Sequence, residues 1–358
     1  MSHLFDAIKL REVEVKNRIV VSPMCQYSSV DGFANDWHLV HLGSRAVGGA
    51  GIIFTEATAV CEEGRITRFD LGIWSDEHIK ELKRITEFIK KQSGKPGIQL
   101  AHAGRKASRT VPWAGNQRIN ENQGGWSNVM APSALAFDEA EPSPQEMSHD
   151  DIGKLITAYR EATLRSLEAG FKILEIHAAH GYLLHEFLSP ISNQRTDEYG
   201  GSFENRTRLL KSIVKEVRKV WVDDYPLFVR LSVTDWLDDR ESWTFEDSMR
   251  IAEELKELGV DVIDCSSGGI IAGATIPVGP GYQTEFSAKI KEKVQVMTGS
   301  VGMITSAQQA DHIIRTGQAD LVLMARQMLR EPYFPLHAAG QLRKDVVWPV
   351  QYERAKGN

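Results

Sequence analysis

Short apolar runs alternate with longer amphipathic stretches along the chain. Eight of these runs are rich in β-branched residues and short enough to be buried parallel strands. They span residues 17–24, 51–58, 97–102, 173–180, 227–233, 260–266, 301–305 and 321–326. Between them, apolar residues recur at helical spacing, as at Ile79, Leu82 and Ile85. This pattern predicts helices over 77–92, 150–169, 205–220, 246–258, 287–293 and 307–316, with helix ends marked by Gly94, Gly170, Gly259 and Gly317.

A regular alternation of strand and helix predicts an α/β fold with a parallel sheet, and eight units predict a closed (β/α)8 TIM barrel. We expect residues 1–358 to form a single domain. The alternative, an open doubly wound sheet, carries G-x-G-x-x-G after its first strand. That pattern is absent from the sequence, and the first predicted strand ends in Ser22, Pro23, Met24 and Cys25. The barrel is therefore favoured.

Residues 103–150 interrupt this alternation between the third strand and its helix. The segment is rich in Pro, Gly, Asn and Trp. Long loops in compact barrels are commonly lids or binding elements, so we expect a lid here.

Composition excludes several classes of function. The 42 basic and 48 acidic residues give a net charge of −6, which argues against nucleic acid or an anionic membrane as a partner. No apolar run reaches the ~18 residues that a membrane helix needs. Met1 to Lys9 lacks a signal-peptide core, so we expect a cytoplasmic protein. The scattered Cys25, Cys61 and Cys265 predict neither disulfides nor a metal site.

The strongest candidate for chemistry follows the fourth predicted strand. Barrel active sites form at the carboxyl ends of strands, and His177, His180 and Tyr182 lie at this one. Two imidazoles there can donate to an oxygen that gains negative charge, and Tyr182 offers a phenolic proton. Spacing alone leaves open the alternative of two hydrogen-bonded structural histidines. A metal is not favoured, because no third ligand is adjacent.

Charges at other strand ends add to this site. Arg230 ends an apolar strand, where a charge is costly unless it is paired. Its partner is either a bound anion or the carboxylate of Asp235 or Glu175. Gly302 and Arg326 close the last two strands, where this fold usually binds phosphate.

The remaining candidates have simpler interpretations. His38 and His41 share a helical face and are predicted to pack, and His185 is expected on the helix after Tyr182. His102 is ambiguous. Cys25 is either a small buried apolar residue or a neighbour of a bound ring.

Several segments resemble the Old Yellow Enzyme family, in particular its thermophilic-like subclass. The longest runs from His177 to Arg206, and the resemblance covers nearly the whole chain. Cysteine at position 25 and the His-x-x-His spacing at 177–180 are typical of the subclass. Further matching segments are 21–27 (VSPMCQY), 97–106 (GIQLAHAGRK) and 351–354 (QYER).

The resemblance implies FMN in the barrel mouth, with NADPH or NADH as the hydride donor. His177 and His180 would bind the substrate oxygen, Tyr182 would donate a proton, and Tyr27 would line the pocket. The residues implied around the flavin ring are Ser22, Pro23, Met24, Cys25, Ala57, Gln99 and Arg230, and those at its phosphate are Gly302, Ala325 and Arg326.

The implied reaction is the reduction of activated alkenes, namely α,β-unsaturated carbonyl and nitro compounds. Hydride would reach the β-carbon from FMN, and Tyr182 would protonate the α-carbon. Dienoyl-CoA reductases and amine dehydrogenases have similar barrels, but three scattered cysteines do not match their iron–sulfur cluster. A flavin-binding sensor or storage barrel without turnover is the other alternative, and the intact His177, His180 and Tyr182 argue against it.

The sequence departs from the family pattern in three places. Ala325 stands where glycine is common, residues 110–129 are longer than in compact members, and the tail continues past Arg354. The subclass resemblance implies a homodimer, or a tetramer of dimers, in which Arg354 reaches the active site of a neighbouring subunit. Trp348 and Tyr352 beside it are residues enriched in interfaces. The alternative is a frayed, solvated terminus.

Overall fold

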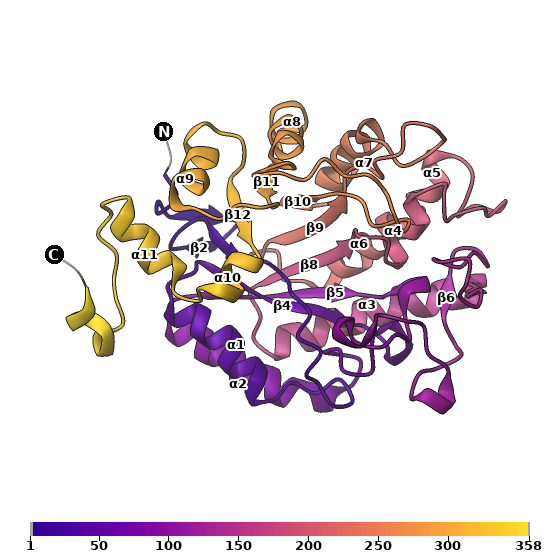
Figure 1. Ribbon diagram of the computed structural model, residues 1–358, viewed down its shortest axis with the longest axis horizontal. Coiled ribbons are helices and arrows are strands. Elements are labelled where there is room, and N and C mark those ends of the chain that lie inside the picture. The colour runs from indigo at the N-terminus through magenta and orange to yellow at the C-terminus, as the bar shows by residue number, and fades with distance from the viewer. Residues whose placement is uncertain (1–2, 357–358) are drawn as a thin grey trace.

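A closed barrel of eight parallel strands forms the centre of the computed structural model, which describes residues 3–356 (Figure 1). Neighbouring strands follow chain order, and the last strand pairs with the first to close the barrel. This confirms the predicted fold class. The strands are β3 (Ile19–Val21), β4 (Ile52–Ala59), β5 (Lys95–Ala101), β8 (Ile173–Ala178), β9 (Leu227–Ser232), β10 (Val262–Ser266), β11 (Met297–Ser300) and β12 (Leu321–Met324).

Helices surround the barrel and pack on it through one apolar face. In α6, Leu209, Ile213 and Val217 are buried at helical spacing. The long helices are α1 (Asp36–Val47), α2 (Ile79–Lys91), α3 (His149–Glu168), α6 (Arg208–Val220), α7 (Phe245–Glu257), α8 (Thr284–Val294) and α9 (Ala307–Arg315). The shorter ones are α4 (Leu183–Leu188), α5 (Phe203–Arg206), α10 (Arg326–Arg330) and α11 (Phe334–Gln341). Within residues 3–356, none of these helices is long and apolar enough to cross a membrane.

The seventh strand was predicted in the wrong place. Residues 301–305 were expected to form it, but β11 is the preceding segment Met297–Ser300. This segment is polar in part, and its pairing with β10 and β12 makes it a strand. Val301 and Ile304 are buried in the connection that follows, which explains their apolar pattern.

A hairpin at the amino end of the barrel was not predicted. It consists of β1 (Ile8–Leu10) and β2 (Val13–Val15), which pair antiparallel. Ile8, Leu10, Val13 and Val15 are buried against apolar residues of the barrel interior. The hairpin therefore closes the amino end of the barrel.

The side chains that fill the interior of the barrel change from apolar to polar along its axis. Alternate residues of a strand share one face, so the inward positions can be followed along three neighbouring strands. They are apolar at the amino end and polar toward the carboxyl end. The series are Ile173, Glu175 and His177 on β8, Phe228, Arg230 and Ser232 on β9, and Val262, Asp264 and Ser266 on β10.

The expected excursion connects β5 to α3, as predicted. It holds η3 (Gly104–Lys106), η4 (Pro112–Ala114), η5 (Glu121–Gln123) and the short paired strands β6 (Met130–Ala131) and β7 (Gln145–Glu146). Exposed Trp113 of this segment meets the Tyr27 ring edge-on, with centroids 5.7 Å apart. That contact joins the excursion to the loop after β3, while its action as a lid stays a prediction.

The chain after α11 projects at the left of Figure 1 and ends in the turn η6 (Val350–Ala355). Residues 345–351 line a cavity together with barrel residues such as Asn17, and the Tyr352 ring centroid lies 5.9 Å from that of Tyr333. Val347 is 95% exposed and Val350 is 77% exposed.

Candidate active site

The turn from β8 into α4 brings His177, His180 and Tyr182 together. The ring centroid of His177 lies 5.1 Å from that of His180 and 5.3 Å from that of Tyr182. His180 and Gly181 both have positive φ, at 60° and 68°. A Cβ at position 181 would collide with the carbonyl oxygen of Gly269, so this turn requires glycine. The predicted constellation is therefore present at the carboxyl end of β8.

Both histidines are held neutral. The His180 Nε2 lies 2.6 Å from the Ser266 hydroxyl, and its backbone N–H donates to the Ser232 hydroxyl at 2.8 Å. Burial lowers the pKa of His177 and His180 well below the usual value, and the nearby Arg230 charge lowers both further. The buried Nδ1 of His177 has no hydrogen-bond partner among the described residues. A ligand oxygen is the kind of partner such a group can take.

Arg230 lies beside His177 on the neighbouring strand β9 and is paired, although with a residue that was not predicted. Its Nε is 3.1 Å from Asp264 Oδ2, and its guanidinium donates to the Ser22 hydroxyl at 3.2 Å. The expected protein partners, Asp235 and Glu175, form no ion pair with it in the described chain. Asp235 instead pairs with His185 at 2.9 Å. Asp264 also lies in an apolar strand. The cost of leaving a charge unpaired there predicts a partner for Asp264 just as it does for Arg230.

Two buried carboxyl groups, Glu175 and Asp264, lie near the single positive charge of Arg230. Gln99 donates to Glu175 Oε1 at 2.7 Å. Burial raises the pKa of both Glu175 and Asp264, and for Glu175 the neighbouring Asp264 raises it further. We therefore interpret the floor of the site as one ion pair, Arg230 with Asp264, beside a protonated Glu175.

The loop after β3 carries the implied ring contacts Pro23, Met24 and Cys25, followed by Tyr27. Its anchor is Glu56, which lies where a register shift interrupts the pairing of β4 with β5. Glu56 accepts from the Gln26 backbone N–H at 2.9 Å and lies 3.2 Å from His38 Nε2. His38 was predicted only to pack, but it also contacts this buried carboxyl group. Burial, and next the charge of Asp70, raises the pKa of the Cys25 thiol, so it remains protonated.

The predicted phosphate residues lie at the ends of two paired strands, β11 and β12. Gly302 has a φ of 123°, and a Cβ there would lie 2.9 Å from the Tyr282 ring. Ala325 precedes α10, and the first N–H groups of a helix have no acceptor within it. The exposed Arg326 forms no ion pair among the described residues. N–H groups and a free cation fit an anionic group.

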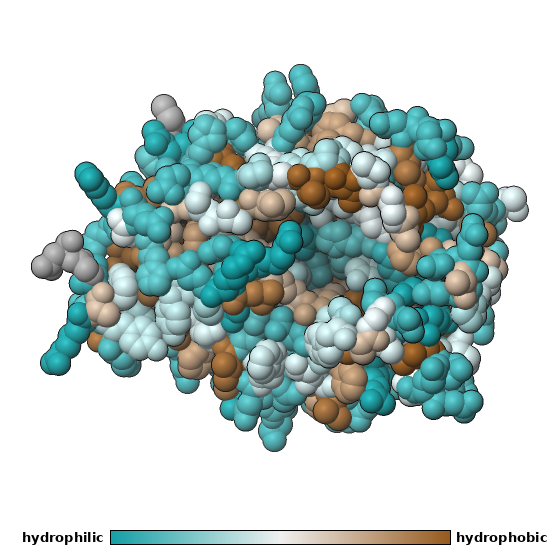
Figure 2. Space-filling view, viewed as in Figure 1, coloured by the Kyte–Doolittle hydropathy of each residue, from teal (hydrophilic) through white to brown (hydrophobic). Residues whose placement is uncertain are grey.

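Figure 2 shows a hollow near the centre of this face, with a mainly hydrophilic floor and hydrophobic residues along part of its rim. Lys106 was not among the predicted site residues, yet it donates to the backbone carbonyls of His180 at 2.8 Å and Gly269 at 2.5 Å. Its Nζ also lies 5.5 Å from the Tyr182 ring centroid. Burial lowers its pKa to about 7. Lys106 thus holds the turns after β8 and β10 together.

The structure does not bring Arg354 to the other predicted site residues. It lies in η6, on the projecting tail, and makes no hydrogen bond or ion pair with them in the described chain. Its predicted role requires a second subunit.

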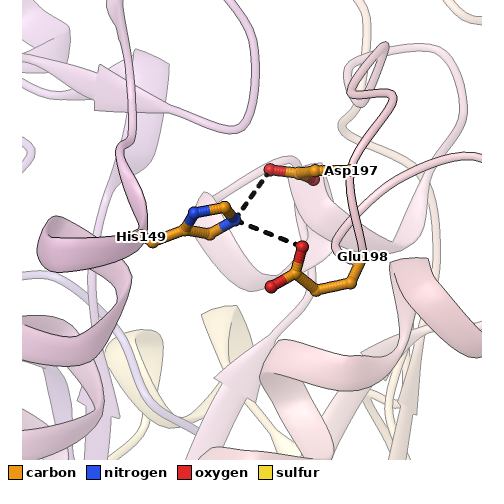
Figure 3. Close-up of side chains that lie close together, drawn as sticks. All are labelled: His149, Asp197 and Glu198. Carbon is orange, nitrogen blue, oxygen red and sulfur yellow. Dashed lines mark ion pairs between the residues drawn. The ribbon is translucent and has the colours of Figure 1, made fainter.

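One cluster within residues 3–356 has three side chains close enough to share a metal ion: His149, Asp197 and Glu198 (Figure 3). His149 Nε2 lies 3.1 Å from Asp197 and 3.3 Å from Glu198. Arg195 already pairs with Asp197 and holds the pKa of that carboxyl at about 2. A cation is therefore already in place, and we interpret the group as a surface ion-pair cluster.

Comparisons with known proteins give consistent results. A model of the NADH:flavin oxidoreductase / NADH oxidase family matches residues 3–345. The NADPH dehydrogenase of Bacillus subtilis (strain 168) is 50% identical over 353 residues, which cover 98% of each chain. Morphinone reductase in complex with tetrahydroNAD aligns with a TM-score of 0.78 at 25% identity, over 98% of this chain and 93% of that one.

A larger protein also has a similar barrel. A 2-naphthoyl-CoA reductase in complex with 2-naphthoyl-CoA aligns with a TM-score of 0.84 at 25% identity. The alignment covers 96% of this chain but 52% of the reductase, so the chain spans about half of that protein.

Proposed function

The chain belongs to the NADH:flavin oxidoreductase / NADH oxidase family, and from this premise we propose that it is an FMN-dependent ene-reductase that uses NADPH or NADH. The family match and the NADPH dehydrogenase relative agree with the Old Yellow Enzyme resemblance and make the chain a flavin-dependent oxidoreductase. The finer proposal, reduction of activated alkenes, rests mainly on one observation. His177, His180 and Tyr182 converge at the carboxyl end of the barrel.

The residues at the barrel mouth fit FMN. The hydroxyl-bonded Arg230 suits the polar edge of a flavin ring, and Gly302, Ala325 and Arg326 suit its phosphate. When bound, FMN would accept hydride from the nicotinamide and pass it to the β-carbon of the alkene. The ring neighbours carried over from the family are Ser22, Pro23, Met24, Cys25, Ala57, Gln99 and Arg230.

The protein side chains would then act on the substrate. His177 and His180 are neutral, so their ring N–H groups can donate to the carbonyl or nitro oxygen and stabilise the charge that develops there. Burial raises the pKa of Tyr182, which keeps its phenol protonated until the α-carbon takes the proton. Tyr27 would line the pocket on the side of the excursion.

We also propose a homodimer, or a tetramer of dimers, in which Arg354 completes the neighbouring active site. The projecting tail and the exposed Val347 and Val350 favour a partner. Truncation before Gln351 should weaken substrate binding more than FMN binding. A monomer that is fully active with and without the tail would contradict this role.

Two assays test the proposed function. Mass spectrometry of the heat-released cofactor should identify FMN, and an adenine-containing flavin would contradict the phosphate site. Steady-state NADPH oxidation should accelerate when 2-cyclohexen-1-one is added under anaerobic conditions. A flavoprotein that shows no acceleration with enones or nitroalkenes would be a sensor or storage protein instead.

A further inference from the structure

A small cavity lies beside Tyr182 and has no part in the function proposed above. Its volume is about 10 Å³, which is roughly the space that one water molecule needs. Three polar side chains line it: Asp70, His102 and Tyr182. The rest of the lining is alanine, glycine and isoleucine. Because a buried water needs two to four polar partners, this lining suits one water molecule.

Asp70 is a buried carboxyl group without an assigned task. It is 2% exposed. It accepts hydrogen bonds from the backbone N–H of Ile66 at 2.7 Å, and from the backbone N–H and the hydroxyl of Thr67 at 3.1 and 2.7 Å. No cation forms an ion pair with it within residues 3–356. A buried, unpaired carboxylate is costly, and burial raises the pKa of Asp70 to about 7. At neutral pH this group can therefore both hold and release a proton.

His102 separates this cavity from a larger one. It is 3% exposed, and its Nδ1 accepts the Gly104 N–H at 3.0 Å, which leaves the proton of the neutral ring on Nε2. His102 also lines a cavity of about 200 Å³ together with Glu63, Asp151 and Lys154. These three side chains are partly or fully exposed. Solvent protons can therefore approach the inner cavity from the side of His102.

The proposed reaction needs a supply of protons. Each turnover converts an alkene, NADPH and one solvent proton into the saturated product and NADP⁺. Tyr182 gives its proton to the α-carbon and is left as a phenolate, which must be protonated again before the next turnover. In the proposed complex the product and FMN would occupy the mouth, so a second route to the hydroxyl would be useful.

We infer that the cavity is the proton-return route of Tyr182, with a single water joining its hydroxyl to the carboxyl group of Asp70. One O–H bond of the water breaks as the Tyr182 O–H bond forms, and the Asp70 carboxyl then restores the water. Asp70 regains its proton from solvent through the larger cavity beyond His102. The step moves protons only, with no oxidation or reduction. It rests on the proposed role of Tyr182 as the acid.

Two variants block this route in different ways. Asp70→Asn removes the titrating carboxyl group, and Ala59→Val narrows the cavity from β4 without replacing a polar group. At rest Tyr182 is protonated in both, so the first reoxidation of the reduced enzyme by an enone should proceed at the parental rate. The steady-state kcat should fall by ~10²-fold, the size of a lost proton-transfer group.

Controls separate this inference from a structural effect and from the proposed function. Ala310→Val adds the same two carbons to a buried site on α9 and should leave both rates unchanged. If the first turnover of Asp70→Asn and Ala59→Val slows in parallel with kcat, or if kcat does not fall, the proton-return route is wrong. If Tyr182→Phe leaves the first turnover at the parental rate, the proposed function fails instead.

Discussion

The amino and carboxyl ends of the barrel are built from the same strands but have different chemistry. Two residues along β9 change the interior from Phe228 to Arg230, and two along β8 change it from Ile173 to Glu175. The amino end is apolar and closed by the β1–β2 hairpin. At the carboxyl end, buried polar atoms such as His177 Nδ1 have no hydrogen-bond partner within residues 3–356.

This difference separates stability from function. Apolar burial at the amino end favours folding by roughly 1.5–3 kcal/mol for each large side chain. Unpartnered polar groups at the carboxyl end cost free energy, and natural proteins retain such groups mainly where a ligand uses them. Substitutions at the amino end should therefore affect stability, and those at the carboxyl end should affect activity.

The largest effect is expected at the carboxyl end. Tyr182→Phe should slow the reoxidation of reduced enzyme by an enone by ~10²–10⁴-fold, because the general acid is lost. Reduction by NADPH should remain close to the parental rate, since no proton from Tyr182 is needed there. Stopped-flow measurement of both half-reactions tests this, and equal slowing of the two would contradict the assigned role.

A substitution at the amino end should show the opposite behaviour. Phe228→Ala should lower the free energy of unfolding by about 3–5 kcal/mol, because it leaves a cavity in the apolar core. The folded variant should reduce enones at close to the parental rate. Urea denaturation and steady-state kinetics measure the two properties. A stable variant with strongly reduced kcat would show that the two ends are not independent.

The free energy of unfolding should depend on pH through the two buried histidines at the carboxyl end, His177 and His180. Burial keeps the pKa of His177 and His180 below 6.5 in the folded protein, so the unfolded chain binds more protons as the pH falls below 6.5. The parent should therefore lose stability relative to the His177→Asn/His180→Asn variant between pH 7 and pH 5. The difference is at most about 1.4 kcal/mol per histidine and pH unit.

Comparison with the variant isolates the two histidines. Buried carboxyl groups with raised pKa values, such as Asp70 and Glu175, act in the opposite direction but are present in both proteins. Denaturation curves that differ by the same amount at pH 7 and pH 5 would contradict the neutral state of the histidines.

The smallest effect is expected at Cys25. Cys25→Ala should shift the reduction potential of the flavin without unfolding the protein, because a sulfur atom beside the ring influences its electronics. Potentiometric titration of parent and variant measures the shift. Identical potentials would make Cys25 a packing residue.

The sequence predicted the barrel well because most strands are buried on both faces and their apolar runs are continuous. β11 was misplaced because its strand pairing, rather than its own composition, makes Met297–Ser300 a strand. The β1–β2 hairpin was missed because each strand has three residues, too few to show a clear alternation. Such short elements depend on tertiary contacts.

The site was predicted where residues follow one another along the chain, as at His177, His180 and Tyr182. Partners from distant segments were missed. Asp264 lies 34 residues after Arg230, and Glu56 and His38 meet across the loop after β3. Asp70 could not be identified as a site residue from the sequence, because an acidic residue in a loop is usually solvated. The fold shows that Asp70 is buried and lines a cavity together with Tyr182.

We propose that the carboxyl end holds FMN beneath a pair of histidines that bind the substrate oxygen. Titration of the purified flavoprotein with a phenol tests it most directly. We expect the flavin spectrum to gain a long-wavelength charge-transfer band as the phenolate stacks on the ring. The His177→Ala/His180→Ala variant should lose this band with FMN still bound. A band that persists with similar phenol affinity in the double variant would contradict the claim.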